Sequence, residues 1–144
     1  MTTFVLDNSV AMRWLLASDK PADQQYAIAT LQSLQGATAL VPTLWHLEAA
    51  NVLLGAKNKD QLSVADVERF ISQLQVLPIQ TDSLTSQQAF GSTLSLAQAY
   101  KLSSYDAAYL ELALREGIPL ATLDKDLLKA ARKAKVDIYL KVSQ

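Results

Sequence analysis

The sequence contains no cysteine among its 144 residues. This absence excludes disulfide bonds, thiolate zinc sites and cysteine nucleophiles. Glycine is also scarce, with only four residues that lie singly along the chain, so no glycine-rich loop is present to cradle a phosphate. A Gly-x-Ser-x-Gly segment is missing too, which disfavours a serine hydrolase. Several common kinds of active site are therefore excluded by composition alone.

Long apolar runs are likewise missing, because no stretch reaches the roughly 18 uncharged apolar residues of a membrane-spanning helix. Residues 1–7 contain neither a basic region nor a long apolar run, and so do not read as a signal peptide. We expect a cytoplasmic protein that does not enter a membrane. The length predicts one domain, spanning residues 1–144.

Charged residues make up only 19% of the chain, whereas 50% is hydrophobic. This balance leaves apolar surface for an interface as well as a core, and it favours a homodimer. The net charge of −1 at first argues against a nucleic-acid partner. If four of the 14 acidic side chains hold cations, however, the 13 basic residues outnumber the remaining ten. Net charge therefore does not decide the question.

Short β-branched runs alternate with longer helical patterns, and this order predicts an α/β fold with a mostly parallel sheet. We expect four to five strands, with helices on both sides of the sheet. The predicted strands are residues 3–6, 39–42, 76–79, 119–123 and 136–140. The predicted helices start near residue 8 and span residues 21–35, 43–57, 81–100, 103–116 and 124–134, with another starting at the Ser63–Asp66 capping pair.

Two aspartates directly follow predicted strands: Asp7 after residues 3–6 and Asp124 after residues 119–123. In an open α/β sheet, ligands bind in the crevice at the carboxyl ends of the strands. If the two strands are parallel, both carboxylates project at the same edge. Either aspartate alone is also explained as an ordinary helix cap.

Glu48 is the only formally charged residue from Gln24 to Ala56, and it lies in a helix that looks too apolar to be exposed on most faces. A carboxylate in such a place must be paired, protonated or bound to a metal, because burying a bare charge is costly. The alternative to a metal is an ion pair with an arginine such as Arg13. Asp106 likewise occupies the first turn of an apolar helix, where capping toward Ser103 is the alternative.

Each of these four acids has an ordinary structural explanation, but the set together indicates a shared site. Clustered carboxylates repel one another, and Mg²⁺ or Mn²⁺ would offset that repulsion. Such ions can activate water and orient a phosphate, so phosphodiester hydrolysis is the chemistry that this set favours.

At this point the sequence resembles the PIN domain, and within it the toxin ribonucleases of VapBC-type toxin–antitoxin pairs. The matching segments are VLDNS at 5–9, EAANVL at 48–53, SYDAAY at 104–109 and LATLDKD at 120–126. They come in the family's order and cover essentially the whole chain. The ordered set is specific, although no single segment is.

The resemblance implies a PIN-like domain and a metal-dependent endoribonuclease that cuts transfer RNA or another structured RNA. Its Mg²⁺ or Mn²⁺ would be held by an acidic quartet of Asp7, Glu48, Asp106 and Asp124. By the same resemblance, the supporting residues would be Ser9, Asn51, Thr122 and Asp126. A cognate antitoxin protein would inhibit the enzyme.

Basic residues near the expected site are candidates for contacting RNA phosphates. Lys125 and Lys129 belong to a basic stretch that begins directly after Asp124, and Arg13 lies one helical turn into the first helix. A stretch of this kind is also explained as an ordinary solvated helix face.

Two other functions remain open at this stage. The first is a magnesium-dependent phosphatase or phosphotransferase with Asp7 as its nucleophile, although Ser9 stands where such enzymes usually place a second aspartate. The second is a non-catalytic PIN-like module that binds RNA, an antitoxin or its own copy.

Overall fold

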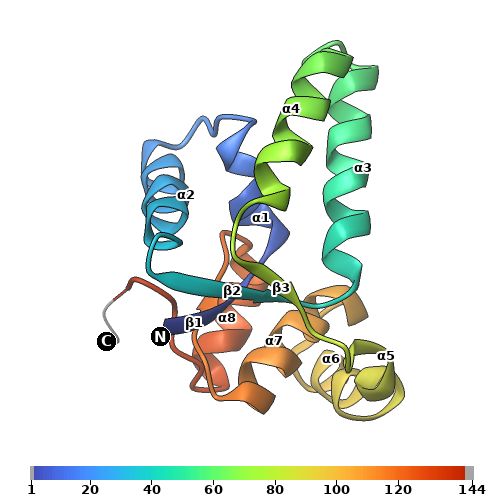
Figure 1. Ribbon diagram of the computed structural model, residues 1–144. Coiled ribbons are helices and arrows are strands. Elements are labelled where there is room, and N and C mark those ends of the chain that lie inside the picture. The colour runs from blue at the N-terminus through green and yellow to red at the C-terminus, as the bar shows by residue number, and fades with distance from the viewer. Residues whose placement is uncertain (1, 142–144) are drawn as a thin grey trace.

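A computed structural model of the chain describes residues 2–141 and shows a parallel β-sheet between two layers of helices (Figure 1). The strands are β1 (Thr2–Leu6), β2 (Ala37–Val41), β3 (Ile79–Thr81) and β4 (Leu120–Ala121). They pair in the order β3-β2-β1-β4, and every pair is parallel. The expected α/β fold with a mostly parallel sheet of four to five strands is thereby confirmed.

β1 lies in the middle of the sheet and pairs with β2 and β4. Its residues Phe4, Val5 and Leu6 are all fully buried, without the alternation of a half-exposed strand. A strand covered on both faces reads as a continuous apolar run, because neither set of side chains meets water. The apolar start of the sequence thus forms the core of the sheet.

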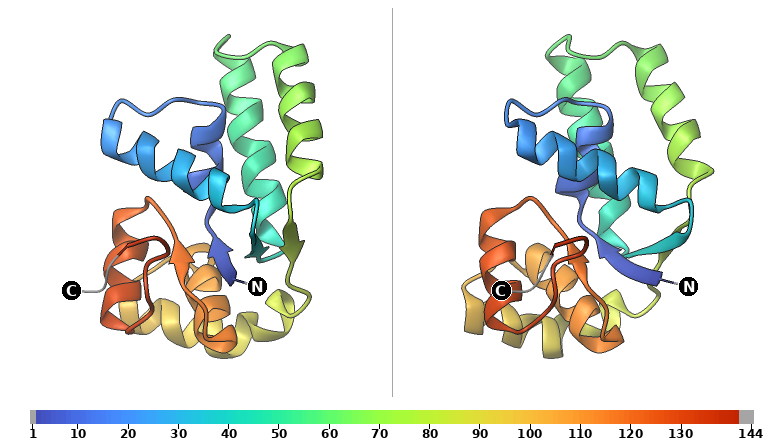
Figure 2. Two further views of the ribbon diagram at one scale, coloured as in Figure 1. Left: turned by 60° about the vertical axis from the view of Figure 1, so that its left-hand side comes forward. Right: turned by 90° about the vertical axis from the view of Figure 1, so that its left-hand side faces the viewer.

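The helices divide between the two faces in the order of the sequence (Figures 1 and 2). One face carries α1 (Asn8–Ala11), the 3₁₀ turn η1 (Met12–Trp14), α2 (Pro21–Ser33), α3 (Leu44–Asn58) and α4 (Val64–Gln75). The other face carries α5 (Thr85–Gln88), the π-helical segment η2 (Ala89–Thr93), α6 (Leu94–Tyr100), α7 (Ser104–Glu116) and α8 (Lys125–Lys133). α3 and α4 form a hairpin that rises away from the sheet (Figure 1). Helices on both sides of the sheet are thus confirmed.

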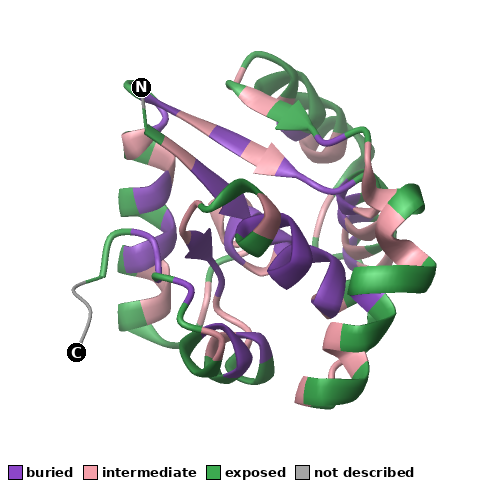
Figure 3. Ribbon diagram, turned by 90° about the horizontal axis from the view of Figure 1, so that it is seen from below, coloured by how far each residue is buried: buried purple, intermediate pink, exposed green. Residues whose placement is uncertain are grey.

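α7 has the longest run of buried residues among the described helices. Seven consecutive residues, 107–113, are buried, and Tyr109 and Leu110 are fully so. Buried residues gather in the middle of the molecule, whereas the outer sides of the peripheral helices are exposed (Figure 3). α7 therefore places its side chains against the sheet and inside the protein. No helix within residues 2–141 is long and apolar enough to cross a membrane.

Helix boundaries mostly follow the expected capping residues. Ser63 and Asp66 form a complete capping box at the start of α4, and Gly117 ends α7 in the left-handed conformation with φ of 64°. Thr43 directly precedes α3, where a capping residue stands, but its side chain makes no capping hydrogen bond. Its backbone N–H instead donates to Thr85 Oγ1 at 3.2 Å.

Three predicted elements differ in the structure. The strand expected at 76–79 begins at Ile79, because Pro78 has no N–H to give to a ladder. Residues 136–140 form a single bridge from Ile138 to Leu120, and the chain turns away at Leu140, whose φ is +61°. The helix expected from residue 81 starts at Thr85, because Thr81 still belongs to β3 and the Asp82 N–H donates to the Val41 carbonyl of β2.

Candidate functional site

Two carboxylates emerge side by side at the carboxyl edge of the sheet. Asp7 directly follows β1, and its N–H donates to the carbonyl of Ala121 at 2.9 Å. Asp124 lies three residues beyond β4, the neighbouring parallel strand, in which Ala121 pairs with Leu6. Parallel pairing therefore brings to one edge two acids that are 117 residues apart in the sequence.

The Asp7 carboxylate is buried and accepts two hydroxyl hydrogen bonds on the same oxygen. Ser9 Oγ donates to Asp7 Oδ2 at 2.6 Å, and Thr122 Oγ1 donates to it at 2.8 Å. Both hydroxyls accept backbone N–H groups in turn, from Leu123 and Asp124, each at 3.0 Å. Their own protons are thus directed toward Asp7. The Asp7 side chain makes no capping bond to α1, so the helix-cap explanation does not describe it.

Asp124 caps α8 with one of its oxygens, since Oδ1 accepts the Leu127 N–H at 2.9 Å. The helix-cap explanation is therefore correct for that oxygen, and it leaves Oδ2 without a hydrogen bond within residues 2–141. Asp126, two residues later, is exposed in the first turn of α8. Among the four acids, only Asp106 has a pKa that the charge of Asp126 raises.

Glu48 lies half-buried on α3, and its Oε1 accepts the Tyr109 hydroxyl at 2.5 Å. An ion pair with Arg13 was the alternative, but the Arg13 guanidinium instead donates to the carbonyl of Leu16 at 3.4 Å. The expectation that α3 is covered on most faces was wrong, because Leu47 is 77% exposed. α3 is an apolar helix with one face open, and Glu48 lies on a partly covered side of it.

Asp106 stands at the third residue of α7, where the Ser103 hydroxyl accepts its N–H at 3.1 Å. Asp66 holds the same place in α4 after Ser63, and its carboxylate returns to accept the Ser63 N–H at 3.0 Å. No such return bond joins Asp106 to Ser103 in the described part of the chain. The Asp106 carboxylate is therefore not used for capping.

The charges of these four acids act on one another. Burial raises the pKa of Asp7 to about 6 against the hydrogen bonds from Ser9 and Thr122, and the charges of Glu48 and Asp124 add to the rise.

Burial also raises the pKa of Asp106 to about 6, with contributions from Asp124, Asp7 and Asp126. The pKa of Glu48 is raised by partial burial and by Asp106. Among residues 2–141, no lysine or arginine forms an ion pair with any of the four. They form one uncompensated acidic group.

A fifth acid at the same edge of the sheet differs from these four, because a basic side chain balances its charge. Asp82 follows β3, and Arg115 donates to both of its oxygens, at 3.0 and 2.8 Å. These bonds lower the pKa of Asp82, in the opposite direction to that of Asp7. Arg115 also donates to Glu111, so this second cluster is a structural ion-pair network and not part of the acidic group.

Whether the acidic group suits a divalent cation depends on its oxygens. Asp7, Glu48 and Asp124 each give one oxygen to protein donors and keep the other free of hydrogen bonds within the described residues. Carboxylate oxygens are the ligands that Mg²⁺ and Mn²⁺ prefer.

The described side chains do not, however, converge as three or more direct ligands around one point. The four acids repel one another, but they do not surround one point as direct ligands. Both features suit an ion that keeps several of its waters, as Mg²⁺ usually does. The donor set therefore fits a hydrated divalent cation.

The remaining candidates lie at different distances from this group. Asn51 is exposed on α3, one turn beyond Glu48, and its side chain makes no hydrogen bond within residues 2–141. Lys125 and Lys129 are exposed on α8 beside Asp124. Tyr109 lies in the core, yet its hydroxyl contacts Glu48. Its spacing of three residues from Asp106 on one helix was the sequence signal for it.

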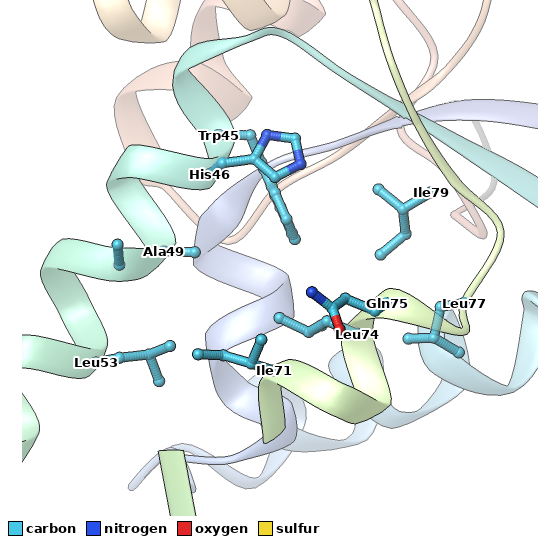
Figure 4. A pocket seen from close by; sticks show the side chains of 10 residues that line it. Trp45, His46, Ala49, Leu53, Ile71, Leu74, Gln75, Leu77 and Ile79 are labelled. Atoms are coloured by element: carbon cyan, nitrogen blue, oxygen red, sulfur yellow. The ribbon is translucent and has the colours of Figure 1, made fainter. Parts of the chain in front are cut away.

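A separate apolar groove of about 300 Å³ lies between α3, α4 and β3 (Figure 4). Trp45 and Leu53 line it from α3, Ile71 and Leu74 from α4, and Ile79 from β3. None of the four acids lines this groove, so it is distinct from the acidic group.

Comparisons with known proteins agree with this architecture. The PIN domain family matches residues 4–133 of the chain. Among solved structures, VapBC2 from Rickettsia felis bound to a DNA fragment from their promoter aligns with a TM-score of 0.64 at 14% identity, covering 95% of this chain and 97% of that one.

PAE2754 from Pyrobaculum aerophilum aligns with a TM-score of 0.62 at 21% identity, covering 90% and 79% of the two chains. A toxin–antitoxin complex from Klebsiella pneumoniae aligns with a TM-score of 0.58 at 21% identity, covering 85% and 88%. No curated protein matches the sequence. At these identities the structural likeness establishes the fold.

Proposed function

The chain belongs to the PIN domain family, and from this premise we propose that it is a divalent-cation-dependent endoribonuclease, the toxin of a VapBC-type toxin–antitoxin pair. PIN domains are typically nucleases, which makes hydrolysis of a nucleic acid the first activity to consider. The finer assignment to RNA, to Mg²⁺ or Mn²⁺ and to a toxin is our proposal.

One observation carries it: four acids from β1, α3, α7 and the start of α8 repel one another with no basic side chain to balance them among the described residues. An uncompensated group of this kind costs folding free energy, and proteins keep such groups at functional sites. Asp82, with its arginine, shows that this chain can balance an acid where only structure requires it.

In this proposal Asp7, Glu48, Asp106 and Asp124 hold the divalent cation, Mg²⁺ or Mn²⁺. When bound, such an ion polarises the phosphate and makes water more acidic. Ser9 and Thr122 fix the Asp7 carboxylate through Oδ2, so that Oδ1 stays available. The α8 amide that bonds to Asp124 does the same for that acid, which leaves Oδ2 free. The chain thus orients its acids before any ligand arrives. Asp126 would add negative charge nearby, and Asn51 lies at the exposed rim.

RNA is the proposed substrate, and α8 supplies the basic surface beside the acids. Lys125 and Lys129 are one turn apart, so both lie on the exposed face of α8, opposite the buried Leu127 and Ala130. Arg13 is a third candidate for contacting a phosphate. Cationic side chains next to an acidic cation site would hold the RNA backbone while the acids hold the ion.

The proposed partners are a cognate antitoxin and a second copy of the chain. One of the structural neighbours is a toxin–antitoxin complex by name and another is VapBC2, which supports an antitoxin for this fold. Exposed apolar side chains, among them Leu47, Leu54 and Phe90, provide surface for protein contacts. We propose that both partners and the RNA are met in the cytoplasm.

The test is incubation of purified protein with total RNA and transfer RNA in the presence of Mg²⁺ or Mn²⁺. Discrete cleavage that disappears with a chelator and in Asp7→Asn supports the proposal. No cleavage by folded protein that binds Mn²⁺ would favour a non-catalytic PIN module, and a phosphoaspartate trapped on Asp7 would favour a phosphotransferase.

A further inference from the structure

Tyr109 stands between two of the four acids although it is fully buried among apolar residues. It lies three residues after Asp106 on α7, so both side chains point to the same side of the helix. Its hydroxyl oxygen lies 2.5 Å from Glu48 Oε1. The charges of Asp7 and Glu48 both act on this hydroxyl. The polar end of a core tyrosine is thus placed inside the acidic group.

The tyrosine donates the hydrogen bond that joins it to Glu48, because the carboxylate oxygen accepts the hydroxyl proton. The backbone N–H of Asn8 also acts on the Tyr109 hydroxyl and lowers its pKa, against the larger effect of burial. Asn8 is the residue directly after Asp7, and its position is set by the end of β1. The Tyr109 hydroxyl therefore holds the Glu48 carboxylate by a direct hydrogen bond and feels the backbone that follows Asp7.

Glu48 needs such a tie. Its side chain is long, only half-buried and repelled by the charge of Asp106, so the unrestrained carboxylate would turn toward solvent. The Tyr109 hydroxyl occupies one carboxylate oxygen and keeps the group beside the other acids, with Oε2 free of hydrogen bonds within residues 2–141.

We propose that Tyr109 is a positioning residue, which holds Glu48 in place for the divalent cation through its hydroxyl. This inference rests on the proposed function, because it assumes that the acids bind a cation. It assigns to Tyr109 no contact with substrate, and its effect passes through Glu48 alone.

The experiment is calorimetric titration of the full chain with Mn²⁺ at pH 7.5. Tyr109→Phe removes only the hydroxyl, and we expect a Kd for Mn²⁺ at least about tenfold weaker, as for other residues that orient metal ligands. Tyr26→Phe is the matched control: its hydroxyl is also buried and bonded, but to the carbonyl of Tyr139 at 2.8 Å and not to a carboxylate. That variant should keep the Kd of the unaltered protein.

A double-mutant cycle separates positioning from a general loss of packing. Glu48→Gln should weaken Mn²⁺ binding, and adding Tyr109→Phe to it should weaken binding no further. An unchanged Kd in Tyr109→Phe, or a further tenfold loss in the Glu48→Gln background, would overturn the inference. If the unaltered protein binds Mn²⁺ and cleaves RNA in those cases, the proposed function survives. If the unaltered protein binds no Mn²⁺, both fail.

A measurement on the unaltered protein covers the case in which Tyr109→Phe does not fold. The chain has four glutamates, so labelling their side-chain carboxyl carbons with ¹³C gives four resonances, and Glu48→Gln identifies one of them. We expect the Glu48 resonance to differ between H₂O and D₂O because of the tyrosine proton, and to keep this difference when Mg²⁺ is added. Loss of the difference on adding Mg²⁺ would show that Glu48 leaves Tyr109 to bind the ion, and would overturn the inference.

Discussion

Asp66 and Asp106 occupy the same position in two Ser-x-x-Asp helix starts, but only Asp66 returns its carboxylate to the capping serine. The two serines behave alike, each accepting the aspartate N–H at 3.1 Å. The pKa of Asp66 is lowered by its bonds to Ser63, whereas that of Asp106 is raised to about 6 by burial and by other acids. One local motif thus serves a helix start in the first case and leaves a carboxylate available in the second.

The metal-free protein should become more stable as the pH falls from 7.5 to 5. Asp7 has a pKa of about 6 when folded against 3.8 as its ordinary value, so above pH 6 folding carries the cost of its buried charge. Between pH 6 and 4 Asp7 takes up a proton in the folded state, which removes that cost. The free energy of unfolding then rises by up to about 1.4 kcal/mol for each unit by which folding raises the pKa. Urea unfolding in the presence of EDTA measures the free energy of unfolding at pH 7.5 and at pH 5. Equal or lower stability at pH 5 would contradict the uncompensated burial of Asp7.

Removing one of the two hydroxyl groups that donate to the Asp7 carboxylate should impair the site more than the fold. In Ser9→Ala or Thr122→Ala, Asp7 Oδ2 keeps one of its two donors and the carboxylate gains freedom to turn. We expect cleavage to fall about 10- to 100-fold, with a loss of about 1 kcal/mol in stability. Ser63→Ala is the control, since it removes a capping hydroxyl far from the acids. Rates that fall equally in all three variants would argue against a specific role for the two hydroxyls.

Arg115 should matter for stability and not for cation binding. Arg115→Met leaves Asp82 and Glu111 without their cation, and both are nearly buried. We expect a loss of about 2–3 kcal/mol, less than for a wholly buried pair because Arg115 is partly exposed.

Acid should remove the same contribution, because the lowered pKa of Asp82 makes the pair stabilising above pH 3.8 and ineffective as the pH falls below it. Urea unfolding and Mn²⁺ titration of Arg115→Met measure the two effects. A changed Kd for Mn²⁺ with unchanged stability would show that this network belongs to the acidic site.

The exposed lysines of α8 should affect RNA and not the ion. Lys125→Ala with Lys129→Ala removes two charges that would contact phosphates. We expect weaker RNA binding. We also expect a weaker salt dependence, in which the slope of log K against log salt concentration falls in magnitude by about one to two. Binding of Mn²⁺ should be unchanged. Lys57→Ala on α3 is the control for loss of a surface charge, and an equal effect there would remove α8 as the RNA surface.

The sequence predicted the architecture because its signals are local. Continuous apolar runs such as Phe4 to Leu6 indicate strands buried on both faces, and Ser63 with Asp66 marks a helix start whatever surrounds it. The weaker predictions concern pairing: residues 136–140 have strand composition, but only Ile138 meets a neighbour. Composition cannot show where a chain turns away.

For the candidate site, the sequence indicated which acids to examine but not how each is held. Strand ends singled out Asp7 and Asp124, and isolation in an apolar helix singled out Glu48. The capping motif does not distinguish Asp106 from Asp66, since both follow a capping serine by three residues. The spacing of Tyr109 from Asp106 places it on the same side of α7, but the partner of its hydroxyl could not be predicted, because Glu48 lies 61 residues away in the chain.

If Asp7, Glu48, Asp106 and Asp124 form one cation site, Asp106 and Asp66 must differ in their effect on it, although both stand in the same Ser-x-x-Asp motif. Mn²⁺ is titrated into the unaltered protein, Asp106→Asn and Asp66→Asn at pH 7.5. We predict a Kd at least about tenfold weaker for Asp106→Asn and an unchanged one for Asp66→Asn. The same Kd in all three proteins would contradict the claim that Asp106 belongs to a cation site.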